Sequence, residues 1–336
     1  MKRALLEWLC CPSCQGSLAL EGADEQDPVV SGRLQCRECR VVFPVIGGIP
    51  RFVSSDGYAK SFSIEWTRFR TTQLDSVTGS NVSERRLQQS IEHPLSALKG
   101  QLVLDAGCGM GRFAEIAAQH GATVIGVDLS YAADVAAQNL SRWPQAHIVQ
   151  ADLRQLPFRP GCFDLVYSLG VLHHAPEPRA AFERLVPFVK PGGRISVTLY
   201  SGYNKVYVAS TTLWRRLTTR LPRAWVYALS YLAIPLYYVY RLPIIGWVGQ
   251  GLWPISMESE PGWRLLDTFD CYTPQYQFYF THSEVHRWFR DAGLVEIAVL
   301  EPGISFIGTR PRQESASRSP ASAAPAAFAD SAAGAR

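Results

Sequence analysis

The first residues of the chain lack the features of a secretory signal peptide. Glu7 interrupts the apolar stretch Met1–Cys14, and no small-residue cleavage site follows it. We therefore expect a cytoplasmic protein whose eight cysteines are kept reduced. In a reducing compartment, closely spaced cysteine pairs indicate a metal site rather than disulfides.

Acidic residues are missing from the segment Ser201–Met257, which carries six basic residues, four Trp and seven Tyr. The rest of the chain has 27 basic and 29 acidic residues, so the net positive charge belongs to this segment. Its uncharged runs, 224–240 and 242–257, hold 17 and 16 residues, whereas a membrane span needs about 20. A span is therefore disfavoured. We expect a helical cap over a ligand cleft, and a second hypothesis adds peripheral contact with the inner face of a membrane.

The stretch Gln101–Arg112 reads Q-L-V-L-D-A-G-C-G-M-G-R and joins an apolar run, Leu102–Leu104, to a glycine-rich turn. The apolar residues predict a buried parallel strand that ends at Asp105, and the glycines let the backbone approach a ligand closely. The G-x-G-x-G spacing differs from the dinucleotide fingerprint, because Arg112 stands where the last glycine would fall. Asp105 would also repel a pyrophosphate, so a ligand with an amino group and a sulfonium suits this turn better.

Acidic residues also end the next two predicted strands. The run 122–127 ends in Asp128, a carboxylate placed to accept hydrogen bonds from ribose hydroxyls. The run 147–151 ends in Asp152 and Leu153, which could hold the amino group and ring of an adenine. Two further apolar runs, at 163–168 and 194–200, predict a fourth and a fifth strand.

The motifs D-A-G-C-G-M-G, V-D-L-S, A-D-L, F-D-L-V-Y-S-L-G-V-L-H-H and K-P-G-G-R-I occur in this order. Together they resemble class I S-adenosylmethionine-dependent methyltransferases of the type 11 kind, over roughly residues 58–200 and the C-terminal portion. The resemblance implies an α/β fold with a doubly wound, seven-stranded, mostly parallel sheet, Rossmann-like, that ends in two antiparallel strands. It also implies an enzyme that uses S-adenosylmethionine. The cofactor-binding residues expected from the motifs are Asp105, Gly107, Gly109, Gly111, Asp128, Leu129, Asp152, Leu153 and Ser168.

Two C-x-x-C pairs, Cys11/Cys14 and Cys36/Cys39, lie in the first 57 residues. Two such knuckles complete a tetrahedral four-thiolate zinc site, which is closed and therefore structural. Redox chemistry is the alternative, but no thioredoxin pattern accompanies the pairs. The segment is similar to the zinc ribbon of the activator subunit of tRNA and protein methyltransferases. Residues 1–60 carry seven basic and seven acidic groups, and this balance argues against nucleic acid as a partner.

These patterns divide the chain into a zinc-ribbon domain at 1–57, a methyltransferase domain at 58–310 and a disordered tail at 311–336. The tail is rich in Ala, Ser and Pro. Within the second domain, 201–257 is the hydrophobic, basic, helical insertion. Tyr58 and Trp66 stand just before the core and either line the cofactor pocket or pack as core aromatics.

A base is needed only if the methyl acceptor loses a proton. His173, on the loop after the fourth strand, is our candidate, although the ring could simply pack against that loop. His282, Asp267 and Asp270 are weaker candidates. The hydrophobic insertion favours a small, hydrophobic or lipid-like acceptor. The alternative is an RNA base methyltransferase with an N-terminal zinc module, against which the missing N-P-P-Y-type motif counts. A non-enzymatic binder is disfavoured by the complete motif set. The acceptor's identity, the acceptor atom, the role of Cys10 and the oligomeric state do not follow from the sequence.

Overall fold

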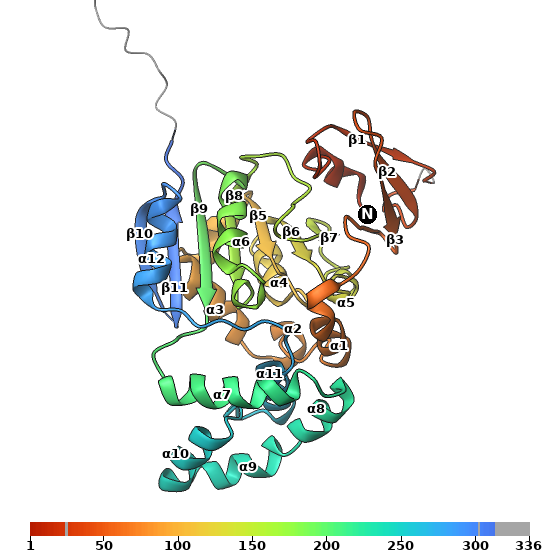
Figure 1. Ribbon diagram of the computed structural model, residues 1–336. Helices are drawn as coiled ribbons and strands as arrows, with labels where there is room; N and C mark the ends of the chain where they lie inside the picture. The colour runs from red at the N-terminus through yellow and green to blue at the C-terminus, as the bar shows by residue number, and fades with distance from the viewer. Residues whose placement is uncertain (24–25, 302, 313–336) are drawn as a thin grey trace, which may run out of the picture.

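The computed structural model describes residues 1–23, 26–301 and 303–312. Figure 1 shows a small N-terminal sheet beside a larger central sheet, with a group of helices at the far end of the molecule. Most of the predicted disordered tail, from residue 313 on, lies outside the described residues.

The central sheet has seven strands in the order β10-β11-β9-β8-β5-β6-β7. The five strands from β5 to β9 are parallel to one another, whereas β11 pairs antiparallel with both β9 and β10. The predicted fold class is therefore confirmed. The strands are β5 (Leu102–Ala106), β6 (Thr123–Asp128), β7 (Ala146–Gln150), β8 (Phe163–Leu169), β9 (Val189–Leu199), β10 (Val295–Leu300) and β11 (Ile304–Thr309).

Helices cover both faces of this sheet. On one face α3 (Val82–Ile91), α4 (Arg112–Gln119) and α5 (Ala132–Asn139) share a hydrophobic core with the sheet. On the other face α6 (Pro178–Leu185) and α12 (His282–Asp291) share a second core. All five residues of β5 are buried between these layers, which explains why its first three residues, Leu102, Val103 and Leu104, form a continuous apolar run rather than an alternating pattern.

The N-terminal sheet is an antiparallel ribbon of β1 (Leu18–Glu21), β2 (Gly32–Cys36), β3 (Val42–Ile46) and β4 (Ile49–Pro50). It is packed tightly against the central sheet, because Leu5, Leu9 and Leu34 belong to the same hydrophobic cluster as the core around α6. Arg51, just after β4, pairs with Asp134 of α5 at 2.7 Å and donates to the Gln150 side chain at 2.6 Å. The ribbon therefore packs on the β7 side of the sheet.

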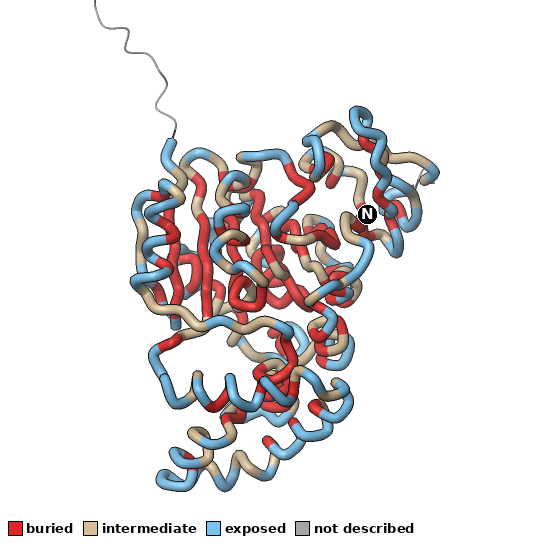
Figure 2. The backbone as a smooth tube through the Cα atoms, viewed as in Figure 1, coloured by how far each residue is buried: buried red, intermediate tan, exposed pale blue. Residues whose placement is uncertain are grey.

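The insertion at 201–257 is helical, as expected, and lies beyond the carboxyl ends of the parallel strands (Figure 1). It contains α7 (Lys205–Thr218), α8 (Arg223–Ser230), α9 (Ala233–Tyr240) and α10 (Pro243–Leu252). Between it and the sheet lie α1 (Lys60–Arg68), α2 (Asp75–Thr78) and α11 (Pro261–Tyr272). Figure 2 shows that much of the outer surface of α8 to α10 is exposed. In the described part of the chain, no helix combines the length and the hydropathy that crossing a membrane requires.

Candidate active site

A cavity opens at the carboxyl ends of the parallel strands and encloses about 1220 Å³, counting open solvent at its mouth. Its walls come from the glycine turn after β5, the end of β6, the loop after β8, and helices α1 and α11. Open α/β sheets bind ligands at this position. The insertion 201–257, all of which is described, contributes no residue to the cavity wall. On this side the cavity wall is formed by α11, and the cap role expected for 201–257 stays a prediction.

The glycine turn brings the backbone to the floor of the cavity. Gly107 has φ 91° and Gly109 has φ 52°, conformations that other residues adopt at a cost. A Cβ atom at Gly107 would collide with the Val171 side chain, and one at Gly109 would lie 3.1 Å from the Trp66 ring. Glycine is therefore required here both for backbone conformation and for the close approach of the two neighbouring walls.

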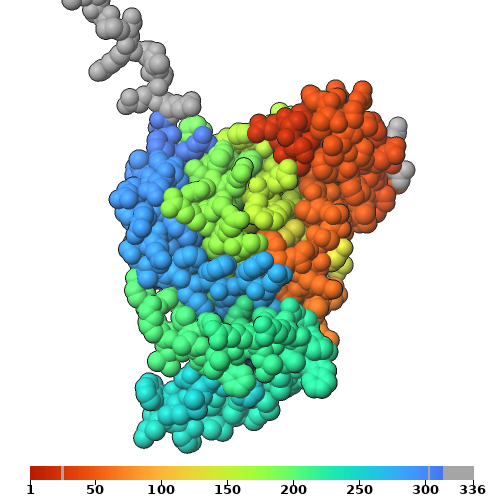
Figure 3. Space-filling model, viewed as in Figure 1, coloured from red at the N-terminus to blue at the C-terminus, as the bar shows by residue number. Residues whose placement is uncertain are grey.

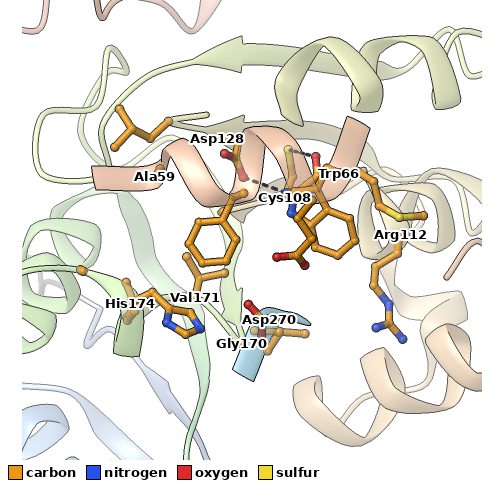
Figure 4. A pocket seen from close by; sticks show the side chains of 18 of the residues that line it. Ala59, Trp66, Cys108, Arg112, Asp128, Gly170, Val171, His174 and Asp270 are labelled. Carbon is orange, nitrogen blue, oxygen red and sulfur yellow. Dashed lines mark hydrogen bonds between the residues drawn. The ribbon is translucent and has the colours of Figure 1, made fainter. Parts of the chain in front are cut away.

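Asp128 lies on the cavity wall at the end of β6 (Figure 4). Its Oδ2 accepts a hydrogen bond from the Gly109 amide at 2.9 Å, and its Oδ1 accepts from the Ser130 amide and hydroxyl. Burial raises the pKa of the Asp128 carboxyl, and these donors oppose that rise. Each carboxylate oxygen can accept more than one hydrogen bond, so Asp128 retains capacity for the hydroxyls of a ligand.

The other predicted cofactor residues fall into two groups. Leu129 and Leu153 line the cavity together with Gly107, Gly109 and Asp128. The remaining four do not line it: Asp105, Gly111, Asp152 and Ser168. Direct cofactor contact by any of these nine residues stays a prediction.

The four residues off the wall lie in different surroundings. Asp105 is buried, no hydrogen bond reaches its Oδ2 in the described chain, and burial raises its pKa to about 8. Ser168 donates to the Ala106 carbonyl at 2.8 Å and so ties β8 to β5. Asp152 is paired with Arg154 at 2.7 Å, and Gly111 precedes the first residue of α4.

The histidine pair after β8 divides between two environments. The predicted base, His173, is fully buried and stacks on Tyr200 with ring centroids 3.7 Å apart. Neither ring nitrogen of His173 has a hydrogen-bond partner in the described chain, and burial holds its pKa well below the usual range. His174 lines the cavity instead, with its Nδ1 3.0 Å from the Tyr276 carbonyl (Figure 4). A catalytic role for His173 remains untested, and its ring has no direct access to the cavity.

The cavity wall contains several residues that the motifs do not identify. Tyr58 and Trp66 lie on it, as one of the two hypotheses for them requires, and so do Asp267 and Asp270 of α11. His282 lies elsewhere and contacts the Tyr203 hydroxyl at 3.1 Å. Polar wall residues without a recognisable motif are Glu65, Gln73, Arg86, Arg112 and Tyr200.

The four cysteines of the ribbon come together. All four sulfurs lie within 4.8 Å of one another, with Cys11 and Cys39 at 3.6 Å and Cys14 and Cys36 at 3.5 Å. A tetrahedral zinc with bonds of about 2.3 Å places its sulfurs about 3.8 Å apart, so this set fits a structural zinc. None of the four is in a disulfide.

Comparison with known proteins agrees with both parts of this description. Residues 104–197 match a family described as a methyltransferase domain, and residues 2–48 match the family of Trm112p-like proteins. The chain joins a Trm112p-like domain to a methyltransferase domain. The recognised resemblance is thereby confirmed, and S-adenosylmethionine is the cofactor of methyltransferases of this kind.

Curated relatives resemble the methyltransferase part. A ubiquinone biosynthesis O-methyltransferase of Coxiella burnetii is 34% identical over 113 residues, 33% of this chain and 48% of that protein. One from Pseudomonas paraeruginosa is 33% identical over 134 residues, 38% of this chain and 56% of that protein. The chain thus spans about half the length of the curated relatives it matches. Among solved structures, a chain from a complex of the Haloferax volcanii Trm112 methyltransferase activator with a methyltransferase is 17% identical. That match covers 76% of this chain and 99% of the other, with a TM-score of 0.44.

The residues on the wall suit S-adenosylmethionine. Asp128 offers a carboxylate to ribose hydroxyls, Leu129 and Leu153 offer apolar contacts to a purine, and the glycine turn admits a ligand close to the backbone. We predict that Asp128→Ala weakens S-adenosylmethionine binding by about 1–3 kcal/mol, because ligand hydroxyls and the Gly109 amide lose their acceptor.

Isothermal titration calorimetry measures this effect. Asp164→Ala is the control, because Asp164 lies at the other end of β8 and pairs with Lys190 at 2.8 Å. Equal affinities in wild type and Asp128→Ala would remove Asp128 from the cofactor site.

We also predict that the purified chain carries about one zinc ion, held by the four ribbon thiolates. Metal analysis should find it in wild type and lose it in Cys36→Ser, whereas Cys162→Ser, which alters a cysteine outside the quartet, should retain it. In thermal unfolding, Cys36→Ser should lower the melting temperature more than Cys162→Ser does, because the folding of a small ribbon depends on its metal. Metal-free wild-type protein with all four thiols open to alkylation would contradict the site.

Proposed function

We propose that this chain is an S-adenosylmethionine-dependent methyltransferase that acts on a small, hydrophobic or lipid-like acceptor. The observation that carries the proposal is the cavity at the carboxyl ends of β5, β6 and β8, where Asp128 and the glycine turn meet. When bound, S-adenosylmethionine supplies an electrophilic methyl group. The chain's contribution is then to hold two reactants in line and to exclude water.

Residues on the α11 side of the cavity support an acceptor that loses a proton. Asp270 accepts a hydrogen bond from Tyr200 at 2.9 Å, and burial raises the pKa of Asp267 to about 7. A carboxyl that titrates near neutral pH suits proton removal from a hydroxyl. The relatives named as ubiquinone biosynthesis O-methyltransferases support an oxygen acceptor on a lipid-like molecule. The RNA alternative is less favoured, because the ribbon has no basic excess.

The decisive experiment is incubation of the protein with methyl-labelled S-adenosylmethionine and fractions of a cell extract. We expect label in a lipid extract with wild type, and less label with Asp128→Ala when S-adenosylmethionine is kept below saturation. Label in RNA would favour the alternative function, and no label in any fraction would overturn the proposal.

The insertion supports contact with an anionic membrane. Apolar side chains are exposed along it, led by Ile244 at 80%, Trp247 at 79% and Leu252 at 69%. The segment that carries them lies at the end of the molecule away from the ribbon (Figure 3). Five of its six basic side chains are exposed or half-buried, and none of these makes an ion pair within the described chain: Lys205, Arg216, Arg220, Arg223 and Arg241. The sixth, Arg215, is buried and donates to the Cys271 and Pro274 carbonyls. Exposed apolar surface beside uncompensated positive charge is typical of membrane-surface segments.

We predict that vesicles containing anionic lipid retain the protein at low salt, whereas neutral vesicles do not. The double variant Ile244→Asp/Trp247→Asp should lower the retained fraction more than about tenfold, because burying each such side chain contributes about 1.5–3 kcal/mol. Vesicle sedimentation measures retention. Val77→Asp is the control, because Val77 is 60% exposed but lies on α2. Equal sedimentation of the double variant and wild type would exclude this surface as the contact.

A further inference from the structure

Three carboxylates line the cavity without a cationic partner. Glu65 comes from α1, and Asp267 and Asp270 come from α11, one helical turn apart. None of the three forms an ion pair within the described ranges of the chain. Figure 4 shows Asp270 reaching the cavity from the side opposite Asp128.

Their hydrogen bonds leave acceptor capacity unused. Glu65 is 1% exposed, and its Oε2 has no partner in the described chain. Asp270 uses Oδ2 for the Tyr200 hydroxyl, while its buried Oδ1 is unpartnered. Asp267 receives only a weak contact, from the Ser256 hydroxyl at 3.4 Å. A fold rarely buries carboxylate oxygens without partners unless a ligand supplies them.

The electrostatics of this wall are unfavourable without a ligand. Burial, together with the charges of Asp270 and Asp267, raises the pKa of Glu65 well above its usual value. Burial and Asp270 also raise the pKa of Asp267. These shifts mean that a positive charge placed in the cavity would stabilise the ionised carboxylates.

The arginines of the cavity do not supply that charge at close range. Arg112 donates to the Gln73 side chain at 2.8 Å and to the Ser83 hydroxyl at 3.1 Å, and Arg154 is held by Asp152. Arg112 and Arg86 lower the pKa of Asp267 through space, but neither reaches ion-pair distance of a carboxylate on this wall.

We propose that Glu65, Asp267 and Asp270 form a cation-selective wall that favours S-adenosylmethionine over S-adenosylhomocysteine. This inference rests on the proposed function. The two molecules share the adenosine, amino and carboxylate groups and differ by one methyl group and the positive charge on sulfur. Methyl transfer breaks the bond between carbon and sulfur, forms a bond from that carbon to the acceptor oxygen, and leaves the electron pair on a neutral thioether. The proton of the acceptor hydroxyl passes to a carboxylate, for which Asp267 is the candidate. The wall therefore attracts the positively charged S-adenosylmethionine and binds the neutral S-adenosylhomocysteine less tightly.

Calorimetry on the full chain tests this selectivity without any methyl acceptor. Wild type should bind S-adenosylmethionine more tightly than S-adenosylhomocysteine. Glu65→Gln and Asp270→Asn should each lower the ratio of the two affinities about three- to tenfold, because a charge removed several ångströms away weakens attraction to a cation but not to a thioether. Glu84→Gln is the matched control, since Glu84 is 42% exposed and pairs with His120 outside the cavity.

The affinity for S-adenosylhomocysteine serves as an internal check that each variant keeps its cavity. If that affinity is preserved and the ratio is unchanged in both variants, the inference is overturned. If the variants misfold, a measurement on the wild-type protein alone still tests the inference. An analogue with an amine in place of the methylsulfonium should bind like S-adenosylmethionine, and binding as weak as that of the thioether would overturn the inference. If wild type binds none of the three compounds, the proposed function fails and this inference fails with it.

Discussion

The absence of a side chain at Gly107 and Gly109, in the turn after β5, is the constraint on which the candidate site depends. With no Cβ at Gly107 or Gly109, the loop after β8 and helix α1 can both close onto the same short stretch of backbone. That closeness also brings the Gly109 amide to the Asp128 carboxylate and thereby joins the ends of two strands. A larger residue at Gly107 or Gly109 would push the neighbouring walls apart, because protein interiors have little space to absorb a displaced side chain.

The sequence predicted those parts of the site that follow from strand order. Asp105 and Asp128 lie at the ends of neighbouring parallel strands, and the carboxyl ends of parallel strands meet at one edge, so their approximate positions could be inferred before any coordinates. Asp128 lies on the cavity wall, whereas Asp105 is buried and does not line it, and cofactor contact by either stays a prediction. The cysteine quartet could also be predicted from the sequence, because two C-x-x-C knuckles leave few other arrangements of the four thiolates. In both cases the chemistry of short motifs limits the possible geometry.

The rest of the site could not be predicted, because it depends on how distant helices pack. Glu65, Gln73 and Arg86 come from segments before β5 that carry no recognisable motif, and only tertiary packing turns them toward the cavity. The insertion shows the same limit. Its composition indicated apolar surface that must be covered, but it did not indicate which helix lines the cavity. In the structure that helix is α11. Apolar periodicity shows that a face is buried without showing what covers it.

Strand β7 is an edge strand of the central sheet, and the ribbon packs along its outer side. The Lys2 ammonium donates to the Ala146 carbonyl at the start of β7, and the Phe52 amide donates to the Gln150 carbonyl at its end. Unprotected sheet edges invite other chains to add strands, and proteins cover them to remain monodisperse. The ribbon thus covers the edge of the central sheet at β7. Because the fold of the ribbon depends on four thiolates and the metal expected between them, loss of that metal would leave this edge open to pairing with another chain.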